Sequence, residues 1–187
     1  MHSDFKRAVR LLDQAEVAQA LALGQQLIGS LEESDRLDGY LCLGFVYEDG
    51  GPGFAPDLDK ALDSFRRASL IAPNAITFLN LARVSLKQKE HAAALRFLYL
   101  SADYEVMPET LLGFGHYFEA HLPSGSAKAR AYYIKAAMRG RFAGFFGYSR
   151  VARASGQVVR AFLMDLLRIV FGPFIALAIG TRARFQF

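Results

Sequence analysis

Apolar residues recur every three or four positions along most of the chain, which is the spacing of one face of an α-helix. In the first segment this pattern runs through Val9, Leu12, Val17, Leu21 and Leu27. No stretch alternates apolar and polar residues with an excess of Val, Ile and Thr, as a half-buried strand would. The pattern therefore predicts an all-α fold.

Three ten-residue segments repeat one internal pattern. They begin at Lys60, Ala93 and Lys128, which are 33 and 35 residues apart. Each has alanine in second place, an aromatic residue in fifth or sixth place and small residues in ninth and tenth place. Small residues let a neighbouring helix approach closely while the ring fills the remaining space. We therefore expect Ala61, Ala68, Ala129 and Ala136 to be buried between helices.

Two glycines occupy matching places in the helical stretches that precede these segments. Gly44 and Gly115 each follow an apolar residue and stand three residues before an aromatic one. Glycine inside a helix costs about 1 kcal/mol relative to alanine. Because the chain has this cost at two matched positions, we expect both glycines to permit a close helix–helix contact. Between the first stretch and its segment, Gly50 to Asp57 predicts a non-helical loop, with Asp57 as the cap of the next helix.

These helix pairs resemble SEL-one-like repeats, relatives of the tetratricopeptide repeats. The first pair carries the family's spaced residues as follows: Gly39, Leu43, Gly44, Tyr47, Gly50, Asp57, Lys60, Ala61, Phe65 and Ala68. The third pair carries Lys128-Ala129, Tyr132-Tyr133, Lys135-Ala136-Ala137 and Gly140. The middle pair, about 74–104, lacks the glycines, and residues 142–147 open a fourth pair whose second helix is expected at 157–171. The resemblance implies a partner-binding concave surface.

The predicted fold is a right-handed α-solenoid of antiparallel helix pairs with helical additions at both ends. We expect an N-terminal helical segment at 1–34, a repeat domain at 35–156 and a C-terminal apolar segment at 157–187. No apolar run of secretory-signal length follows the early charges, so no such signal is expected.

The C-terminal segment is unlike an ordinary repeat. Gly172-Pro173 is expected to interrupt its helix, and the uncharged run from Ile169 to Gly180 is 12 residues. A membrane-spanning helix needs about 20 apolar residues. Three interpretations stay open: a broken or surface-lying membrane helix, a true span, or a cap of the solenoid. The first is preferred because apolar residues are flanked by arginines. The residues expected to contact the membrane are Phe162, Leu166, Phe171, Phe174, Ile175, Arg182 and Arg184.

Charge is divided unequally along the chain, although the net charge is only +4. Residues 1–59 carry 11 acidic and 4 basic side chains, whereas residues 120–187 carry 11 basic ones and a single acid, Asp165. This division predicts that the C-terminal end meets an anionic surface. The residues expected to bind a partner there are Arg139, Arg141, Arg150 and Arg153.

No catalytic, cofactor or metal site is expected. His116 and Glu119 can share a helix face, but His121 adjoins the Pro123 loop, and zinc usually takes three or four protein ligands. Cys42 stands among leucines without a cationic neighbour, which predicts a buried structural thiol. A single cysteine also rules out an internal disulfide and fits a reducing compartment.

Taken together, these patterns predict a non-catalytic protein-interaction scaffold or adaptor rather than an enzyme. We expect it in the cytoplasm, peripheral to or anchored in a membrane through its C-terminal segment. Its partner would be another protein, with an anionic membrane surface as a second contact. The alternative is a soluble regulator that binds an acidic protein or nucleic acid through the basic end. Nucleic acid is disfavoured because the aromatic residues fall at repeat core positions.

Overall fold

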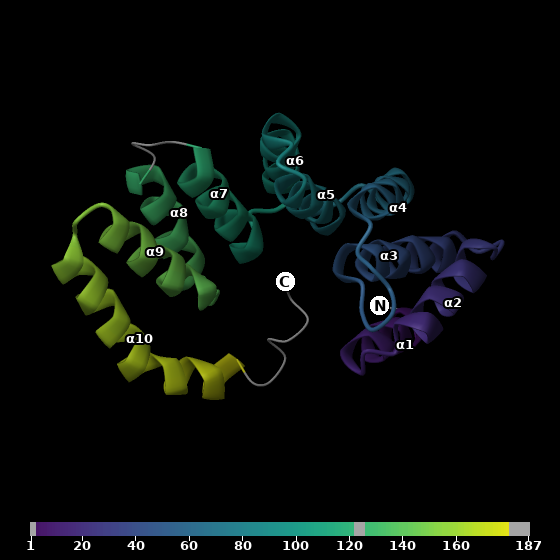
Figure 1. Ribbon diagram of the computed structural model, residues 1–187, viewed down its shortest axis with the longest axis horizontal. Coiled ribbons are helices and arrows are strands. Elements are labelled where there is room, and N and C mark those ends of the chain that lie inside the picture. Colours follow the sequence, from purple (N-terminus) through teal and green to yellow (C-terminus); the bar gives the residue numbers. More distant parts are fainter. Residues whose placement is uncertain (1–2, 122–125, 180–187) are drawn as a thin grey trace. The chain divides into compact units, whose positions relative to one another are not determined.

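The structure, a computed structural model, describes residues 3–121 and 126–179 (Figure 1). These residues form ten helices and no strand. The helices are α1 (Ser3–Asp13), α2 (Val17–Ile28), α3 (Glu33–Asp49), α4 (Leu58–Ile71), α5 (Ala75–Lys87), α6 (His91–Tyr104), α7 (Pro108–His121), α8 (Ser126–Met138), α9 (Ala143–Ala154) and α10 (Val158–Ile179). The all-α prediction is confirmed, and successive helices pack against each other from α1 to α5 and from α7 to α10, which is consistent with an α-solenoid.

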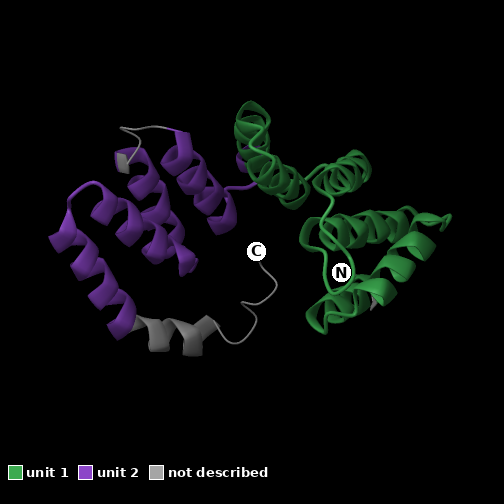
Figure 2. Cartoon of the chain, in the orientation of Figure 1, with its two compact units in different colours: residues 1–101 green, residues 102–187 purple. Residues whose placement is uncertain are grey.

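The chain divides into two compact units, residues 1–101 and 102–187 (Figure 2). The first unit holds α1 to α5 and most of α6, and the second holds α7 to α10. The division falls near the end of the degenerate middle repeat.

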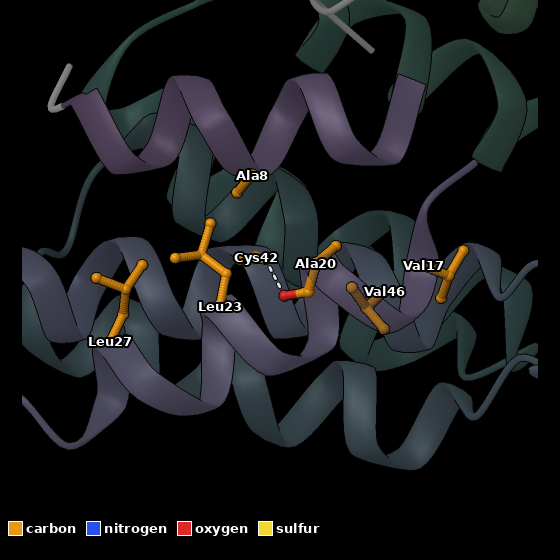
Figure 3. Close-up of a cluster of buried hydrophobic side chains, with 7 residues drawn as sticks. All are labelled: Ala8, Val17, Ala20, Leu23, Leu27, Cys42 and Val46. Carbon is orange, nitrogen blue, oxygen red and sulfur yellow. Dashed lines mark hydrogen bonds between the residues drawn. The ribbon is translucent and has the colours of Figure 1, made fainter. Parts of the chain in front are cut away.

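The N-terminal helices build the first core cluster. The segment 1–34 contains α1 and α2, separated at Ala15, whose φ of 58° ends α1 in a left-handed turn. Figure 3 shows the cluster: Ala8, Val17, Ala20, Leu23, Leu27, Cys42 and Val46. The Cys42 thiol donates to the Ala20 carbonyl oxygen at 3.2 Å, so this buried thiol is part of the core, as predicted.

The segment between α3 and α4 is a non-helical loop, as its glycines predicted. Gly50 has a φ of 62° and ends α3, where a side chain would be strained. Gly51 and Phe54 then exchange two backbone hydrogen bonds of 2.8 and 2.9 Å, and the Phe54 ring packs near Tyr47. The Asp57 carboxylate accepts from the Lys60 amide at 3.0 Å, which confirms the expected N-cap of α4.

The expected helix–helix contacts are confirmed in both units. Ala61, Ala68, Ala129 and Ala136 are all fully buried. A Cβ placed on Gly44 would lie 2.4 Å from the ring of Phe65, and one on Gly115 would lie 2.5 Å from the ring of Tyr133. Both glycines are therefore required by a ring on the next helix.

The C-terminal segment differs from the prediction in one respect. The helix does not stop at Gly172-Pro173, because α10 continues as one helix to Ile179. Proline removes a single backbone donor, so a helix can pass through it when the neighbouring turns keep their hydrogen bonds. The expected interruption, and with it the second-helix range 157–171, is wrong. Within the described residues, no helix combines the length and the apolar character needed to cross a membrane.

Ala136→Leu tests the packing of the repeat. The added side chain has no space in a fully buried position, so we expect the free energy of unfolding to fall by about 1–3 kcal/mol. Ala131→Leu, on an exposed position of the same helix, should change it by less than about 0.5 kcal/mol. Chemical denaturation followed by circular dichroism measures both, and equal effects would contradict the helix packing described above.

Candidate interaction surfaces

Four polar side chains from three helices meet in the second unit. His116 and Glu119 lie one turn apart on α7, Tyr133 comes from α8 and Arg150 from α9. Arg150 forms a bidentate ion pair with Glu119, with Nε to Oε1 and Nη2 to Oε2 both at 2.6 Å. The Tyr133 hydroxyl donates to Glu119, accepts from Arg150 at 3.3 Å and lies 3.0 Å from His116 Nδ1. We call these four residues the α7–α9 clasp.

Two glycines bring the tyrosine into this clasp. Its ring is fully buried, and a Cβ on Gly115 or on Gly147 would lie 2.5 or 2.6 Å from it. The ring therefore fits between α7 and α9 only because both helices have glycine there. Its hydroxyl lies beside Glu119. It donates to this residue of α7 and accepts from Arg150 of α9, so it links the two helices.

The clasp shifts the pKa of each of its titratable members. Burial raises the pKa of Tyr133, and the neighbouring Glu119 raises it further. Burial alone would raise the pKa of Glu119, but the hydrogen bonds from Arg150 and Tyr133 outweigh it and hold that pKa below its usual range. His116 is exposed in part, but the burial of its ring and the Arg150 charge lower its pKa.

A second clasp of the same design lies in the first unit. Glu48 follows Gly44 by four residues on α3, just as Glu119 follows Gly115 on α7. Its buried carboxylate forms a bidentate pair with Arg83 of α5, with Nε to Oε1 at 2.7 Å, and also binds Lys87 Nζ at 2.8 Å. We call Glu48, Arg83 and Lys87 the α3–α5 clasp. Phe65 takes the place of Tyr133 here and has no hydroxyl to contribute.

The clasps do not form a metal site. His121 has a partner in its own helix, with its Nδ1 2.8 Å from the Tyr117 carbonyl oxygen. In the described part of the chain, no three His, Cys, Asp or Glu side chains are grouped as metal ligands would be. Burial raises the pKa of the Cys42 thiol to about 12, so it is not a nucleophile at neutral pH.

The four arginines expected to bind a partner are placed differently from one another. Arg150 is held in the α7–α9 clasp, and Arg153 pairs with Asp165 of α10. Arg141 lies 3.6 Å from Glu109, and burial lowers its pKa. Arg139 is exposed and donates one hydrogen bond, from Nη1 to the Val106 carbonyl oxygen at 2.7 Å. Three of these four arginines therefore have a carboxylate of the chain within 4 Å, and Arg139 does not among the described residues.

The polarity of α10 is reversed relative to an ordinary surface helix. Its side toward α9 holds Ala161, the ion-paired Asp165, and Arg168, whose guanidinium lies 4.1 Å from the centre of the Phe146 ring. At 100° per residue, seven exposed apolar residues cover an arc of about 160° on the other side: Val159, Phe162, Leu163, Leu166, Leu167, Ile169 and Val170. We call this arc the outer α10 face.

The residues expected to contact a membrane fall partly on this face. Phe162 and Leu166 are exposed there, with 64% and 46% of their surface accessible. Phe171, Phe174 and Ile175 belong to α10, but their side chains lie outside the described residues. Arg182 and Arg184 also lie outside the described residues.

The clasps were not predicted from the sequence. The helical spacing of His116 and Glu119 indicated that these two residues share a face, but nothing in it pointed to Tyr133, Arg83 or Glu48. A signal was present, because a glutamate follows the matched glycine by four residues in both units.

No protein-family model matches this sequence, and no curated protein matches it either.

Glu48→Gln tests the α3–α5 clasp. The substitution leaves the Arg83 and Lys87 charges without their buried carboxylate, so we expect the free energy of unfolding to fall by about 1–3 kcal/mol. Asp49→Asn is the matched control, because this neighbouring carboxylate is exposed and binds only Lys87 among the described residues. It should cost less than about 0.5 kcal/mol in the same denaturation experiment. A similar loss in both variants would contradict a specific role for Glu48.

His116 should make the second unit sensitive to acid. Its pKa is lowered by folding, so the unfolded chain binds more protons and stability falls as the pH drops below about 6.5. The lowered pKa of Glu119 adds a further loss at lower pH. We expect amide hydrogen exchange in α7 and α9 to accelerate between pH 7.5 and 5.5, after correction for the intrinsic rate, and His116→Gln to reduce that change. His121→Gln is the control, and an equal effect from it would argue against the clasp as the cause.

Proposed function

We propose that this protein is a non-catalytic protein-interaction scaffold that lies on an anionic membrane surface through α10. In this proposal the helix pairs form a right-handed solenoid of SEL-one-like repeats at the cytoplasmic face of the membrane. The observation that carries the membrane contact is the outer α10 face, where only apolar side chains are exposed over an arc of about 160° away from α9.

An internal comparison supports this assignment. Arg83 of α5 and Arg150 of α9 hold corresponding places 67 residues apart, and the same offset relates Ala94 of α6 to Ala161 of α10. Both alanines are fully buried, so residues of α6 and α10 that are 67 positions apart can be compared. At the position of the buried Leu98, α10 has Asp165, and at the positions of the exposed Arg96 and Tyr99 it has Leu163 and Leu166. At matched positions α10 thus has an acid where α6 buries a leucine, and a leucine where α6 exposes Arg96.

This reversal suits a bilayer interface. A helix that lies in the interface buries an apolar face near the acyl boundary and keeps polar residues on the opposite side. Basic residues near the surface add about 1 kcal/mol each when they meet anionic headgroups. Arg160, exposed at one edge of the outer α10 face, is placed for such a contact.

Flotation with vesicles tests the membrane contact. The full chain should float with phosphatidylserine-containing vesicles at low salt, and high salt should weaken the binding without abolishing it, because apolar burial remains. Leu163→Gln with Leu166→Gln should lower the partition coefficient by about tenfold or more, since two leucines no longer leave water. The matched control is Arg96→Gln with Tyr99→Gln on α6, which should float as the unaltered chain does.

Two outcomes would count against the proposal. If the full chain stays unbound at low salt, the basic end serves a soluble regulator that binds an acidic protein or nucleic acid instead. If both double variants lose flotation equally, the outer α10 face is not the contact.

A further inference from the structure

Basic side chains of α4 in the first unit, and of the corresponding helix α8 in the second, lie over aromatic rings. In the first unit, Lys60 of α4 lies 5.5 Å from the centre of the Tyr47 ring, and Arg67 lies 5.9 Å from that of Tyr40. In the second unit, Lys128 of α8 lies 5.5 Å from the Phe118 ring, and Lys135 lies 5.4 Å from the Tyr132 ring. Lys60 and Lys128 are 68 residues apart, as are Arg67 and Lys135 and the aligned alanines.

The two units differ in what neutralises these cations. Lys60 pairs with Asp57 at 2.9 Å, and Arg67 pairs with Asp63 at 2.8 Å. The corresponding residues of the second unit are Gly125 and Ala131. In the part of the chain that the structure describes, no carboxylate pairs with Lys128 or Lys135. At both places the second unit thus has an uncharged residue where the first has an acid.

The unneutralised cations lie along one stripe of α8. Lys128 and Lys135 are seven residues apart, which places them two turns, or about 10.5 Å, from each other on the same face. Arg139, directly after α8, continues the stripe one turn further on and remains exposed. The corresponding residue of the first unit is Ile71. We call Lys128, Lys135 and Arg139 the α8 basic stripe.

We propose that the α8 basic stripe binds an acidic segment of a partner protein. This inference rests on the proposed scaffold function and names the chemistry of its partner. The carboxylates that neutralise Lys60 and Arg67 within the chain would be supplied to Lys128 and Lys135 by the partner. Carboxylates about 10 Å apart fit, a spacing met by residues seven apart on a helix or three apart in an extended chain.

The surroundings of the stripe favour a protein over the other anionic ligands. Single-stranded nucleic acid is held by bases that stack on aromatic faces, but here the ammonium groups lie over the rings of Phe118 and Tyr132. A bilayer takes up exposed apolar side chains, but of the exposed apolar residues beside the lysines, Ala127, Ala131 and Met138, only Met138 offers a large apolar area. Charge complementarity to carboxylates is what remains, and it gives specificity and a fast association.

Binding of labelled poly-L-glutamate of about twenty residues to the full chain tests the inference by fluorescence anisotropy. We expect binding at low salt, and Lys128→Gln with Lys135→Gln should weaken it about fivefold, as two solvent-exposed ion pairs would. The matched control is Lys60→Gln with Arg67→Gln, which removes the same charge from cations that already have carboxylates. It should leave the dissociation constant within about twofold, because no exposed contact to the probe is lost.

A second variant restores the acid that the second unit lacks. Ala131→Asp places a carboxylate four residues before Lys135, as Asp63 stands before Arg67, and should weaken binding about threefold. The position is exposed, so the variant should fold normally. Equal losses in the two double variants would overturn the inference, because net charge alone would then explain binding. An unchanged Ala131→Asp would overturn it as well, as would tighter binding of a twenty-nucleotide oligothymidine.

This test is independent of the membrane contact. Leu163→Gln with Leu166→Gln on α10 should bind poly-L-glutamate as the unaltered chain does. If the chain floats with vesicles but does not bind poly-L-glutamate, the membrane proposal is supported and this inference is wrong. A chain that binds the probe but does not float gives the opposite result.

Discussion

The seating of an aromatic ring against a helical glycine is the contact on which each unit depends. Phe65 lies against Gly44 and Tyr133 against Gly115, at distances that no side chain on the glycine would permit. This close approach sets the rotation of the first helix, because the glycine must face the ring. The glutamate four residues later then lies on nearly the same face, about one turn further along. From there it reaches the arginine of the following helix pair, so the glycine contact and the clasp are one construction.

The two units share the same helix packing but differ in their exposed residues. The clasps, the buried alanines and the cations of α4 and α8 recur at matched positions, whereas Asp57 and Asp63, which neutralise the cations of α4, have no acidic counterpart in the sequence of the second unit. Similarly, α10 has Asp165 at the place of the buried Leu98 of α6 and Leu163 at the place of the exposed Arg96. Exposed positions can change in this way because their side chains contribute little to stability, while the buried positions between helices are held by packing. The units can therefore differ at exposed positions without a change in the way their helices pack.

The sequence predicts the local part of this construction well and the long-range part poorly. Helical spacing and the repeated alanines predict Ala61, Ala68, Ala129 and Ala136 as buried, because packing demands small residues at a fixed period. The partners of Glu48 and Glu119 could not be chosen in this way, since Arg83 and Arg150 stand 35 and 31 residues away among many arginines. Gly172-Pro173 was misleading for a related reason: whether a proline ends a helix depends on the turns around it, which the dipeptide alone does not reveal.

Counting the basic residues of the C-terminal end overestimates how many of them are free to bind a partner. Arg150 and Arg153 pair with carboxylates, Arg141 lies near one, and Arg168 lies over the Phe146 ring, so much of the positive charge in that end is used inside the second unit. A cation already bound to a carboxylate gains little from a second one, because the new contact must compete with the old. What distinguishes Lys128 and Lys135 is the loss of neighbouring acids that the first unit retains. A comparison of matched positions therefore separates charge that holds the fold together from charge that can meet a partner.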